Sequence, residues 1–281
     1  MQEAIDSKSI IIASSNLTDE DKAILKSLCA RTFAGDVTLK TTEAINKKTT
    51  LCIVPAETNT GDNTDKDNIR ACARTLKVMR SALAGIPIVT PDWLRSCEKE
   101  NKAVEPVTFV RSMPTKEAVI GNSRDTDYGV AKMAASWSTQ PKTPVLPFRK
   151  TVVYLCGSYS ADKRKNLQDL LKAGGAKIIL KPKDVSSRLK SLVESNKLSF
   201  FPSSGRLVIL CGDSGVTMPK SVEKDLKAAL EGEQHWPEPK SPKTVTVVGS
   251  QWVIESVTCA KPMPAAFFEP KINKDLWKLS L

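Results

Sequence analysis

The chain has 281 residues, of which 41% are hydrophobic and 26% are charged. These are the proportions of a soluble globular protein, and the length suggests two domains. No apolar run approaches the ~20 residues of a transmembrane helix, and Met1 to Ser9 lack the apolar stretch of a signal peptide. The seven cysteines stand singly, without zinc-ligand spacing, and there is one histidine, so we expect reduced thiols in an intracellular protein.

The charge is distributed unevenly along the chain. Residues 1–110 carry 15 Lys+Arg and 15 Asp+Glu, whereas the remaining 171 residues carry 27 and 16 and so hold the whole net charge of +11. A basic surface attracts nucleic acid, phosphopeptides or acidic tails, but it also confers solubility with no partner at all. The charge alone favours neither interpretation.

The first 105 residues alternate short apolar strands with amphipathic helices. Strands are expected at residues 9–13, 37–39, 50–54 and 86–89, and helices after Thr18, across 67–83 and around Trp93. We expect the first helix to end at Phe33-Ala34-Gly35, and a polar loop to occupy residues 56–66. Alternation of this kind predicts a small, mostly parallel sheet with helices on both faces.

The helix expected at 67–83 carries two stripes of side chains. Ile69, Cys72, Leu76, Met79 and Leu83 form one apolar face, and Arg70, Arg74 and Lys77 form a basic stripe beside it. Like charges at this spacing repel by a few tenths of a kcal/mol (~0.2–0.5) per pair. The basic stripe is therefore either a solvated face or a place where an anion binds.

Residues 106–149 differ in kind from the segments on either side. Prolines punctuate them and Gly121-Asn122-Ser123 is a turn, which together indicate a linker, with one short helix expected near 127–137. The alternating pattern returns over residues 150–270. A tail at 271–281 remains, which can dock through Trp277 and Leu279.

The second half repeats the order of the first. Strands are expected at 151–156, 177–180, 206–211 and 245–248, and helices at 162–173, 220–230 and after Gly249-Ser250. Extra polar stretches fall at 181–205 and 231–243. Trp93 and Trp252 occupy equivalent places, each on the first turn of the last helix of its repeat. Each side chain is expected to be buried in the hydrophobic core. Two copies indicate a tandem of domains rather than a solenoid.

The segments IVTPDWLRSC and VTVVGSQWVIES resemble the closing strand and tryptophan helix of BRCT domains, and the helix stops Gly35 and Gly174-Gly175 fit as well. The resemblance implies an α/β fold with two BRCT-like repeats, each a four-stranded parallel sheet flanked by helices, packed through a helical interface. It places the first repeat at 1–105, the linker at 106–149, the second repeat at 150–270 and the tail at 271–281. It also implies that the apolar face of the helix at 67–83 belongs to that interface.

Many BRCT pairs bind phosphoserine or phosphothreonine peptides, and the resemblance transfers their site residues to this chain. It implies that the Ser15 hydroxyl, the Asn16 backbone N–H, Thr75 and Lys77 contact the phosphate. It further implies that Arg74 contacts the residue three past the phosphate, or a free C-terminal carboxylate, with Met79 beside the pocket for that residue's side chain. Asn16 departs from the usual glycine, and Ser14 can supply the hydroxyl instead of Ser15.

The physical chemistry of phosphate agrees with such a set of donors. A phosphate carries nearly two charges and several acceptor oxygens, and charge-assisted hydrogen bonds are the strong kind. The planar fork of Arg74 suits a carboxylate. The alternative is that Ser15 only caps a turn while Arg74 and Lys77 are solvated. In the second repeat Ser158 is available, but Glu223 and Asp225 flank Lys224, so we expect no second phosphate site.

An enzyme is not expected. The string Gly212-Asp213-Ser214-Gly215 is similar to the nucleophile loop of trypsin-like proteases, but the single histidine, His235, follows in a polar, proline-rich stretch and offers no plausible base. No phosphate-binding loop, dinucleotide fingerprint or carboxylate pair appears, and we expect no metal or cofactor.

The functional prediction is a phosphopeptide-binding module of a nuclear DNA-damage-response scaffold. Among BRCT pairs, the chain is similar to those of fungal scaffolds that bind the gamma-phosphorylated histone tail at DNA breaks. The competing hypothesis is a phospho-independent protein scaffold, or a pair that contacts DNA through the basic second half.

Overall fold

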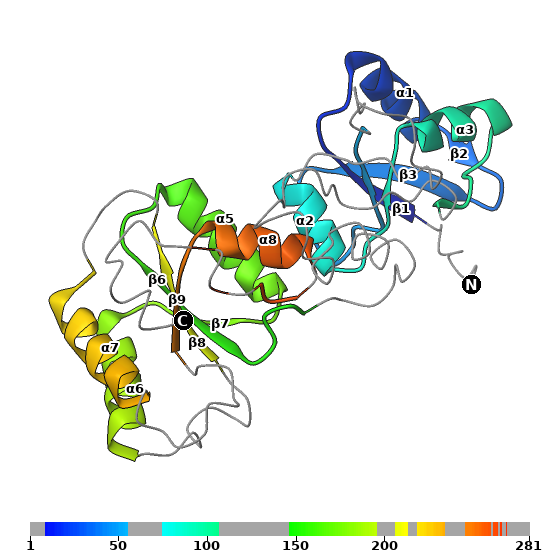
Figure 1. Cartoon of the computed structure of the whole chain (residues 1–281). Coiled ribbons are helices and arrows are strands. Elements are labelled where there is room, and N and C mark those ends of the chain that lie inside the picture. Colours follow the sequence, from blue (N-terminus) through cyan, green and yellow to red (C-terminus); the bar gives the residue numbers. More distant parts are fainter. Residues whose placement is uncertain are drawn as a thin grey trace, which may run out of the picture. The chain divides into compact units, whose positions relative to one another are not determined.

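The computed structural model describes residues 9–55, 75–106, 146–195, 206–212, 218–233, 245–259, 261–263, 265 and 268. The chain divides into two compact units, Met1–Val145 and Leu146–Leu281. Each unit has its own β-sheet with helices packed on it (Figure 1). The helix expected near 127–137 and the tail with Trp277 and Leu279 lie outside the described residues, and the finer repeat and linker boundaries stay predictions.

The first unit contains five strands and three helices among its described residues. They are β1 (Ser9–Ser14), α1 (Asp19–Cys29), β2 (Thr32–Phe33), β3 (Val37–Thr42), β4 (Leu51–Ile53), α2 (Leu76–Leu83), β5 (Ile88–Val89) and α3 (Asp92–Glu100). The strand order in the sheet is β2-β3-β1-β4-β5. The β3, β1, β4 and β5 strands are parallel, as predicted, and they form the expected four-stranded unit.

One strand of this sheet was not expected. The β2 strand pairs antiparallel with β3, with Thr32 opposite Thr38 and Phe33 opposite Val37. The prediction that α1 runs on to Phe33 is therefore wrong, because α1 ends at Cys29 and the next residues enter the sheet. Gly35, with φ +76°, forms the tight turn between β2 and β3 rather than a helix cap.

The single helix predicted across 67–83 is also wrong. Thr75 is extended, with φ −73° and ψ 160°, and its side chain caps α2 by accepting a hydrogen bond from the Val78 N–H. The helix thus begins at Leu76, and residues 67–74 lie outside the described residues. Hydrophobic spacing did not reveal the break, because an apolar period that continues in sequence does not require a continuous helix.

The second unit contains four parallel strands and four helices among its described residues. They are β6 (Thr151–Cys156), α5 (Ala161–Ala173), β7 (Lys177–Ile179), α6 (Pro182–Ser195), β8 (Arg206–Cys211), α7 (Lys220–Glu233), β9 (Val245–Gly249) and α8 (Gln251–Thr258). The strand order is β7-β6-β8-β9, so this sheet has the predicted parallel, four-stranded form. Helices α6 and α7 pack together on one face of the sheet, and α5 and α8 lie on the other (Figure 1).

Helix α6 occupies much of a stretch that the sequence indicated only as polar, 181–205. Pro182 opens the helix and Asp184 follows in its first turn, both favourable at a helix N-terminus. Val185 and Leu189, one turn apart, are fully buried in the core. A helical signal was available in the sequence, because Val185, Leu189, Leu192 and Val193 stand at i, i+4, i+7 and i+8, but the many polar residues between them obscured it.

The cores of the two sheets are closed by the two tryptophans. Trp93 is 0% exposed and its indole N–H donates to the Val104 carbonyl at 2.9 Å. Trp252 is 1% exposed and donates to the Met263 carbonyl at 2.8 Å, with the Phe148 ring 5.2 Å away between centroids. Each indole therefore buries its rings and still satisfies its polar atom.

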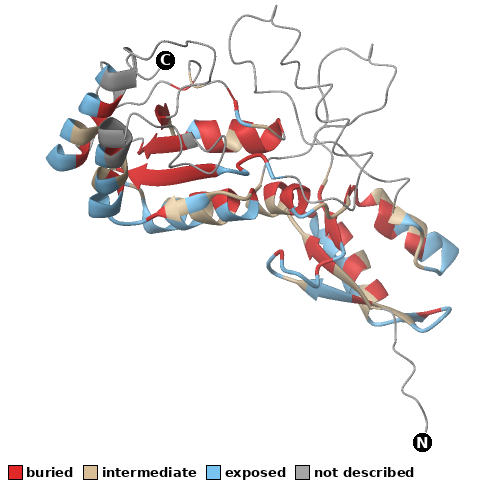
Figure 2. Cartoon of the chain, turned by 90° about the horizontal axis from the view of Figure 1, so that it is seen from below, coloured by how far each residue is buried: buried red, intermediate tan, exposed pale blue. Residues whose placement is uncertain are grey.

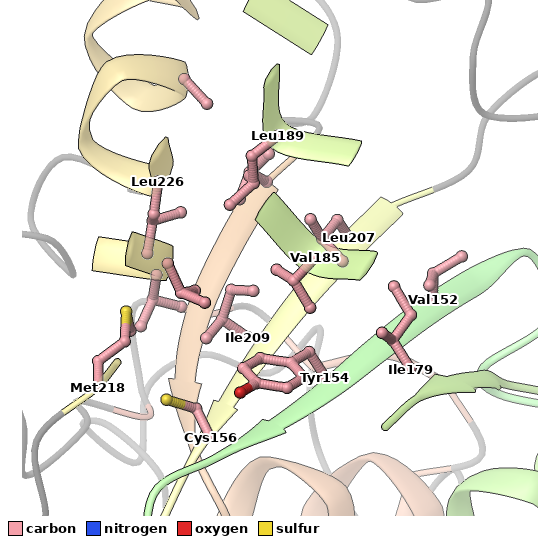
Figure 3. Close-up of a cluster of buried hydrophobic side chains, with 14 of the residues drawn as sticks. Val152, Tyr154, Cys156, Ile179, Val185, Leu189, Leu207, Ile209, Met218 and Leu226 are labelled. Carbon is pink, nitrogen blue, oxygen red and sulfur yellow. The ribbon is translucent and has the colours of Figure 1, made fainter. Parts of the chain in front are cut away.

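The strands of the second sheet are buried between the helical layers (Figure 2). Alternate residues of β6, β8 and β9 form a hydrophobic cluster with the inner faces of α6 and α7 (Figure 3). None of the helices described in either unit combines the length and the apolar character needed to cross a bilayer.

Candidate functional site

The candidate site lies where the first strand of the first sheet ends. Ser14 is the last residue of β1 and is the register partner of Ile53 on β4. One residue later, the Ser15 N–H donates to the Ile53 carbonyl at 3.0 Å, so the chain stays tied to the sheet while it turns away. The carboxyl edge of a parallel sheet is the usual place for ligand binding in α/β folds.

The residue after Ser15 has an unusual backbone conformation. Asn16 is exposed and has φ +56°, in the left-handed region that few residues other than glycine adopt. Asparagine tolerates this region better than most residues. The departure from the family's glycine thus preserves the backbone conformation that a glycine would supply.

Thr75 joins this turn to the second helix. The Ser15 hydroxyl donates to the Thr75 hydroxyl oxygen at 3.0 Å, and the same oxygen accepts the Val78 N–H at 3.3 Å. The cap of α2 is therefore in direct contact with the end of β1, although the two residues are far apart in sequence. The N-terminal end of α2, with its partial positive charge, lies at this edge.

Lys77 brings a full positive charge to the same place. Its ammonium group donates to the Ser14 carbonyl at 2.8 Å, and the side chain is partly buried. An ammonium group has three donors, so this bond holds Lys77 beside the Ser15 and Thr75 hydroxyls without using its full donor capacity. Hydroxyl donors, a helix N-terminus and an ammonium group at one edge form an arrangement suited to an oxyanion.

The interior side of α2 is closed and uncharged. Ser81, one turn after Lys77, is fully buried, and burial raises the pKa of the Cys52 thiol on β4, which keeps that thiol neutral. Met79 on the same helix is 5% exposed. The Lys77 ammonium lies at the end of β1, beside the Ser14 carbonyl, whereas the residues on the inner side of α2 are neutral.

The structure brings four of the six predicted ligand-contacting residues together: Ser15, Asn16, Thr75 and Lys77. Arg74 lies outside the described residues, and Met79 is buried on the inner part of α2. Two features were missed from the sequence, the Ser14 carbonyl as the partner of Lys77 and the role of Thr75 as a helix cap. The capping role of Thr75 could have been predicted from the sequence, because threonine is one of the preferred residues at a helix N-cap.

The equivalent edge of the second sheet carries different chemistry. The strands β6 and β8 end in Cys156 and Cys211, which are register partners. The Tyr159 hydroxyl donates to the Leu210 carbonyl at 2.8 Å, and burial raises the pKa of Tyr159 well above its ordinary value. The carboxylate of Glu223, near the start of α7, acts electrostatically on Cys156. Thiols, a phenol and a carboxylate thus lie where the first sheet has hydroxyls and an ammonium group.

Comparison with known proteins identifies the fold. Residues 7–98 match the model of the BRCA1 C Terminus (BRCT) domain. The BRCT5-BRCT6 domains of S. pombe Brc1 align with 97% of this chain and 99% of their own, at 15% identity and a TM-score of 0.50. Residues 7–98 are therefore a BRCT domain, and the chain as a whole has the fold of a tandem BRCT pair.

Other solved structures align over most of the chain with lower TM-scores. Rad4 BRCT1,2, solved in complex with a Crb2 phosphopeptide, aligns with 93% of this chain and 97% of its own at 10% identity, but with a TM-score of 0.26. Yeast Rtt107, solved with Mms22, aligns with 94% of this chain and 50% of its own at 13% identity and a TM-score of 0.29. No curated protein sequence matches the chain.

Proposed function

We propose that this BRCT pair is a phosphopeptide-binding module of a nuclear DNA-damage-response scaffold, and that its first repeat binds the phosphate of a phosphoserine or phosphothreonine. One observation carries the proposal. The Lys77 ammonium, 2.8 Å from the Ser14 carbonyl, lies at the edge where Ser15 and Thr75 meet and where α2 begins. This set of donors supports a protein-interaction role.

The bound phosphate would take its hydrogen bonds from groups already in place. The Ser15 hydroxyl rotates from Thr75 to a phosphate oxygen, and the Asn16 N–H, held by its left-handed conformation, supplies a second donor. Lys77 adds a charge-assisted contact worth ~1.5–3 kcal/mol. Little rearrangement is needed, so little of the interaction energy is lost in ordering the site.

A finer proposal concerns how the protein recognises the peptide residues that follow the phosphorylated one. Arg74 directly precedes the Thr75 cap in sequence and is proposed to bind a free C-terminal carboxylate, as at the end of a gamma-phosphorylated histone tail. Met79, being buried, would shape the wall near that residue by packing. A ligand with both a phosphate and a terminal carboxylate is thus the proposed partner.

Isothermal titration calorimetry tests the phosphate site. The proposal expects binding of a gamma-phosphorylated histone-tail peptide, no binding of the same peptide without phosphate, and a large loss of affinity in Lys77→Met. The matched control is Lys26→Met, which removes an exposed lysine from α1 and should leave the affinity unchanged. If the tail peptide fails to bind, a library with fixed phosphoserine separates a wrong partner from a wrong site. Equal affinity of folded Lys77→Met and the parent for any phosphopeptide would sink the proposal.

A second candidate function, DNA binding, is favoured by a basic cluster at the opposite, amino edge of the second sheet. Exposed Arg149 and Lys150 directly precede β6, and exposed Lys177 opens β7 beside it. The Phe148 N–H donates to the Gly174 carbonyl at 2.8 Å, which brings the C-terminal turn of α5, with exposed Lys172, to the same edge. Phosphate backbone contacts of this kind give an affinity that falls steeply with salt.

Fluorescence anisotropy with a labelled DNA duplex at several salt concentrations tests this candidate. Joint replacement of Lys150, Lys172 and Lys177 by glutamine should lower both the affinity and its salt slope. The control is the peptide titration, which the triple variant should leave unchanged. Salt-independent binding, or binding unaffected by the triple variant, would rule out the cluster as a DNA surface.

A further inference from the structure

Two buried cysteines face each other in the second sheet. Cys156 and Cys211 are the last residues of β6 and β8 and are paired in register, with 0% and 1% of their surfaces exposed. Tyr154 and Ile209, two residues earlier on the same strands, belong to the same core cluster as both cysteines (Figure 3). Because alternate residues of a strand point to one face, both thiols lie on the face covered by α6 and α7.

Their spacing is compatible with a disulfide. Neighbouring strands of a sheet lie ~4.7–4.9 Å apart, and the Cα atoms of disulfide-bonded cysteines usually lie ~4.4–6.8 Å apart. The two thiols also influence each other's ionisation. The neighbouring Cys211 thiol holds the pKa of Cys156 below the ordinary thiol value, whereas the Cys156 thiol and burial raise the pKa of Cys211. One thiol of the pair therefore ionises before the other, and Cys156 is taken as the first nucleophile.

We propose that Cys156 and Cys211 are a site of reversible oxidation, at which hydrogen peroxide converts the two thiols into a disulfide between β6 and β8. The Cys156 thiolate attacks one peroxide oxygen, so an S–O bond forms and the O–O bond breaks, which gives a sulfenic acid. The hydroxide that leaves takes up the proton released by the Cys156 thiol and departs as water. The Cys211 sulfur then attacks the Cys156 sulfur. The S–S bond forms, the S–O bond breaks, and hydroxide leaves with the Cys211 proton as water. Two thiols are oxidised and one peroxide is reduced.

The surroundings of the pair favour a reversible bond. The sheet fixes the separation of the two strands, and any departure from relaxed disulfide geometry that it imposes makes the bond easier to reduce. Both cysteines are terminal in their strands, and strand ends open locally at lower free energy than strand centres, which admits a small oxidant. The Glu223 carboxylate opposes thiolate formation at Cys156, which slows the reaction of that thiol with an oxidant.

The first sheet provides a natural control. Cys52 is a buried cysteine on β4, but its register partners are Ala13 on β1 and Ile88 on β5, so neither neighbouring strand pairs it with a cysteine. The proposal concerns only the second repeat and does not rest on phosphopeptide binding at the first.

The test treats the whole native chain with hydrogen peroxide, alkylates the remaining thiols in denaturant, and maps the peptides by mass spectrometry without reduction. The expected result is a single Cys156–Cys211 cross-linked peptide that dithiothreitol removes. Cys156→Ser and Cys211→Ser should abolish it, whereas Cys52→Ser should retain it at the parent level. The melting temperature of the oxidised parent should rise and return on reduction, because the bond constrains the unfolded chain.

Three results would overturn the proposal. One is alkylation of both Cys156 and Cys211 after peroxide treatment that oxidises other thiols of the chain. Another is conversion of Cys156 to sulfinic acid without a cross-link. The third is a cross-link that forms only when peroxide is added in denaturant, since the folded sheet would then play no part. The parent protein alone decides all three, so poor folding of a serine variant leaves the test intact.

Discussion

The carboxyl edges of the two sheets share a backbone plan and differ in chemistry. In the first repeat the edge gathers the Ser15 and Thr75 hydroxyls and the Lys77 ammonium. In the second it gathers the paired thiols Cys156 and Cys211, with the Glu223 carboxylate close by. The comparison teaches that the same edge of one fold can present different functional groups, so the proposed functions of the two edges differ as well.

The largest effect should come from the feature that the two repeats share. Trp93→Ala and Trp252→Ala each remove a fully buried indole, a change that costs ~3–5 kcal/mol in protein cores. Each variant should lower the melting temperature of its own repeat, by roughly 2–4 °C per kcal/mol for a chain of this size. Differential scanning calorimetry measures this directly. A melt identical to the parent's would show that the tryptophan does not stabilise its repeat.

The next effect should separate the two edges. Lys77→Met deletes the charged donor, and the affinity for a phosphopeptide should fall roughly 10- to 150-fold, the equivalent of ~1.5–3 kcal/mol. Glu223→Met, the matching change at the other edge, should leave that affinity unaltered. Calorimetric titration of the two variants, with folding checked by circular dichroism, gives the comparison. Equal losses in both would mean that the phosphate is not bound by the first repeat.

The ligand can be varied in place of the protein. A phosphopeptide with a free C-terminal carboxylate should bind more tightly than its C-terminal amide, by roughly 10-fold or more, if Arg74 makes a charge-assisted bond to the carboxylate. The same pair of peptides titrated into Arg74→Gln should show no difference. Equal affinities in the parent would reject the carboxylate hypothesis and leave phosphate binding intact.

A smaller effect is expected from the backbone of the first edge. Asn16→Val places a β-branched residue at φ +56° and should destabilise the first repeat by ~1–2 kcal/mol, whereas Asn16→Gly should be nearly neutral. Urea unfolding curves measure both. The second edge has glycine at a comparable turn, Gly157 with φ +88°, so Gly157→Asn tests whether asparagine is tolerated there too. Equal stability of Asn16→Val and the parent would contradict the left-handed conformation.

The smallest effect should follow removal of one neutral donor. Ser15→Ala deletes the hydroxyl that bonds Thr75 and is proposed to bind phosphate, and it should weaken phosphopeptide binding by ~0.5–1.5 kcal/mol, roughly 2- to 12-fold. Ser14→Ala tests the other serine, whose carbonyl, not its hydroxyl, holds Lys77. A larger loss in Ser14→Ala than in Ser15→Ala would assign the phosphate-binding hydroxyl to Ser14.

The sequence by itself determined the repeat and the four parallel strands of each sheet. Strand and helix periods are local properties, and the two Trp segments recur at equivalent places, so these features could be predicted without a structure. The residues of the proposed phosphate site were named from the family resemblance. Spacing in sequence could not bring Ser15 and Thr75 together, because their contact depends on the packing of α2 against β4.

Only the tertiary structure decided the features that depend on long-range contacts. The β2 strand exists because Thr32 and Phe33 find partners on β3. Thr75 interrupts the long helix expected from the sequence. Its hydroxyl caps the N-terminus of α2 and accepts a hydrogen bond from Ser15. Cys156 and Cys211, separated by most of the second repeat, become neighbours only through strand register, which short-range patterns do not encode.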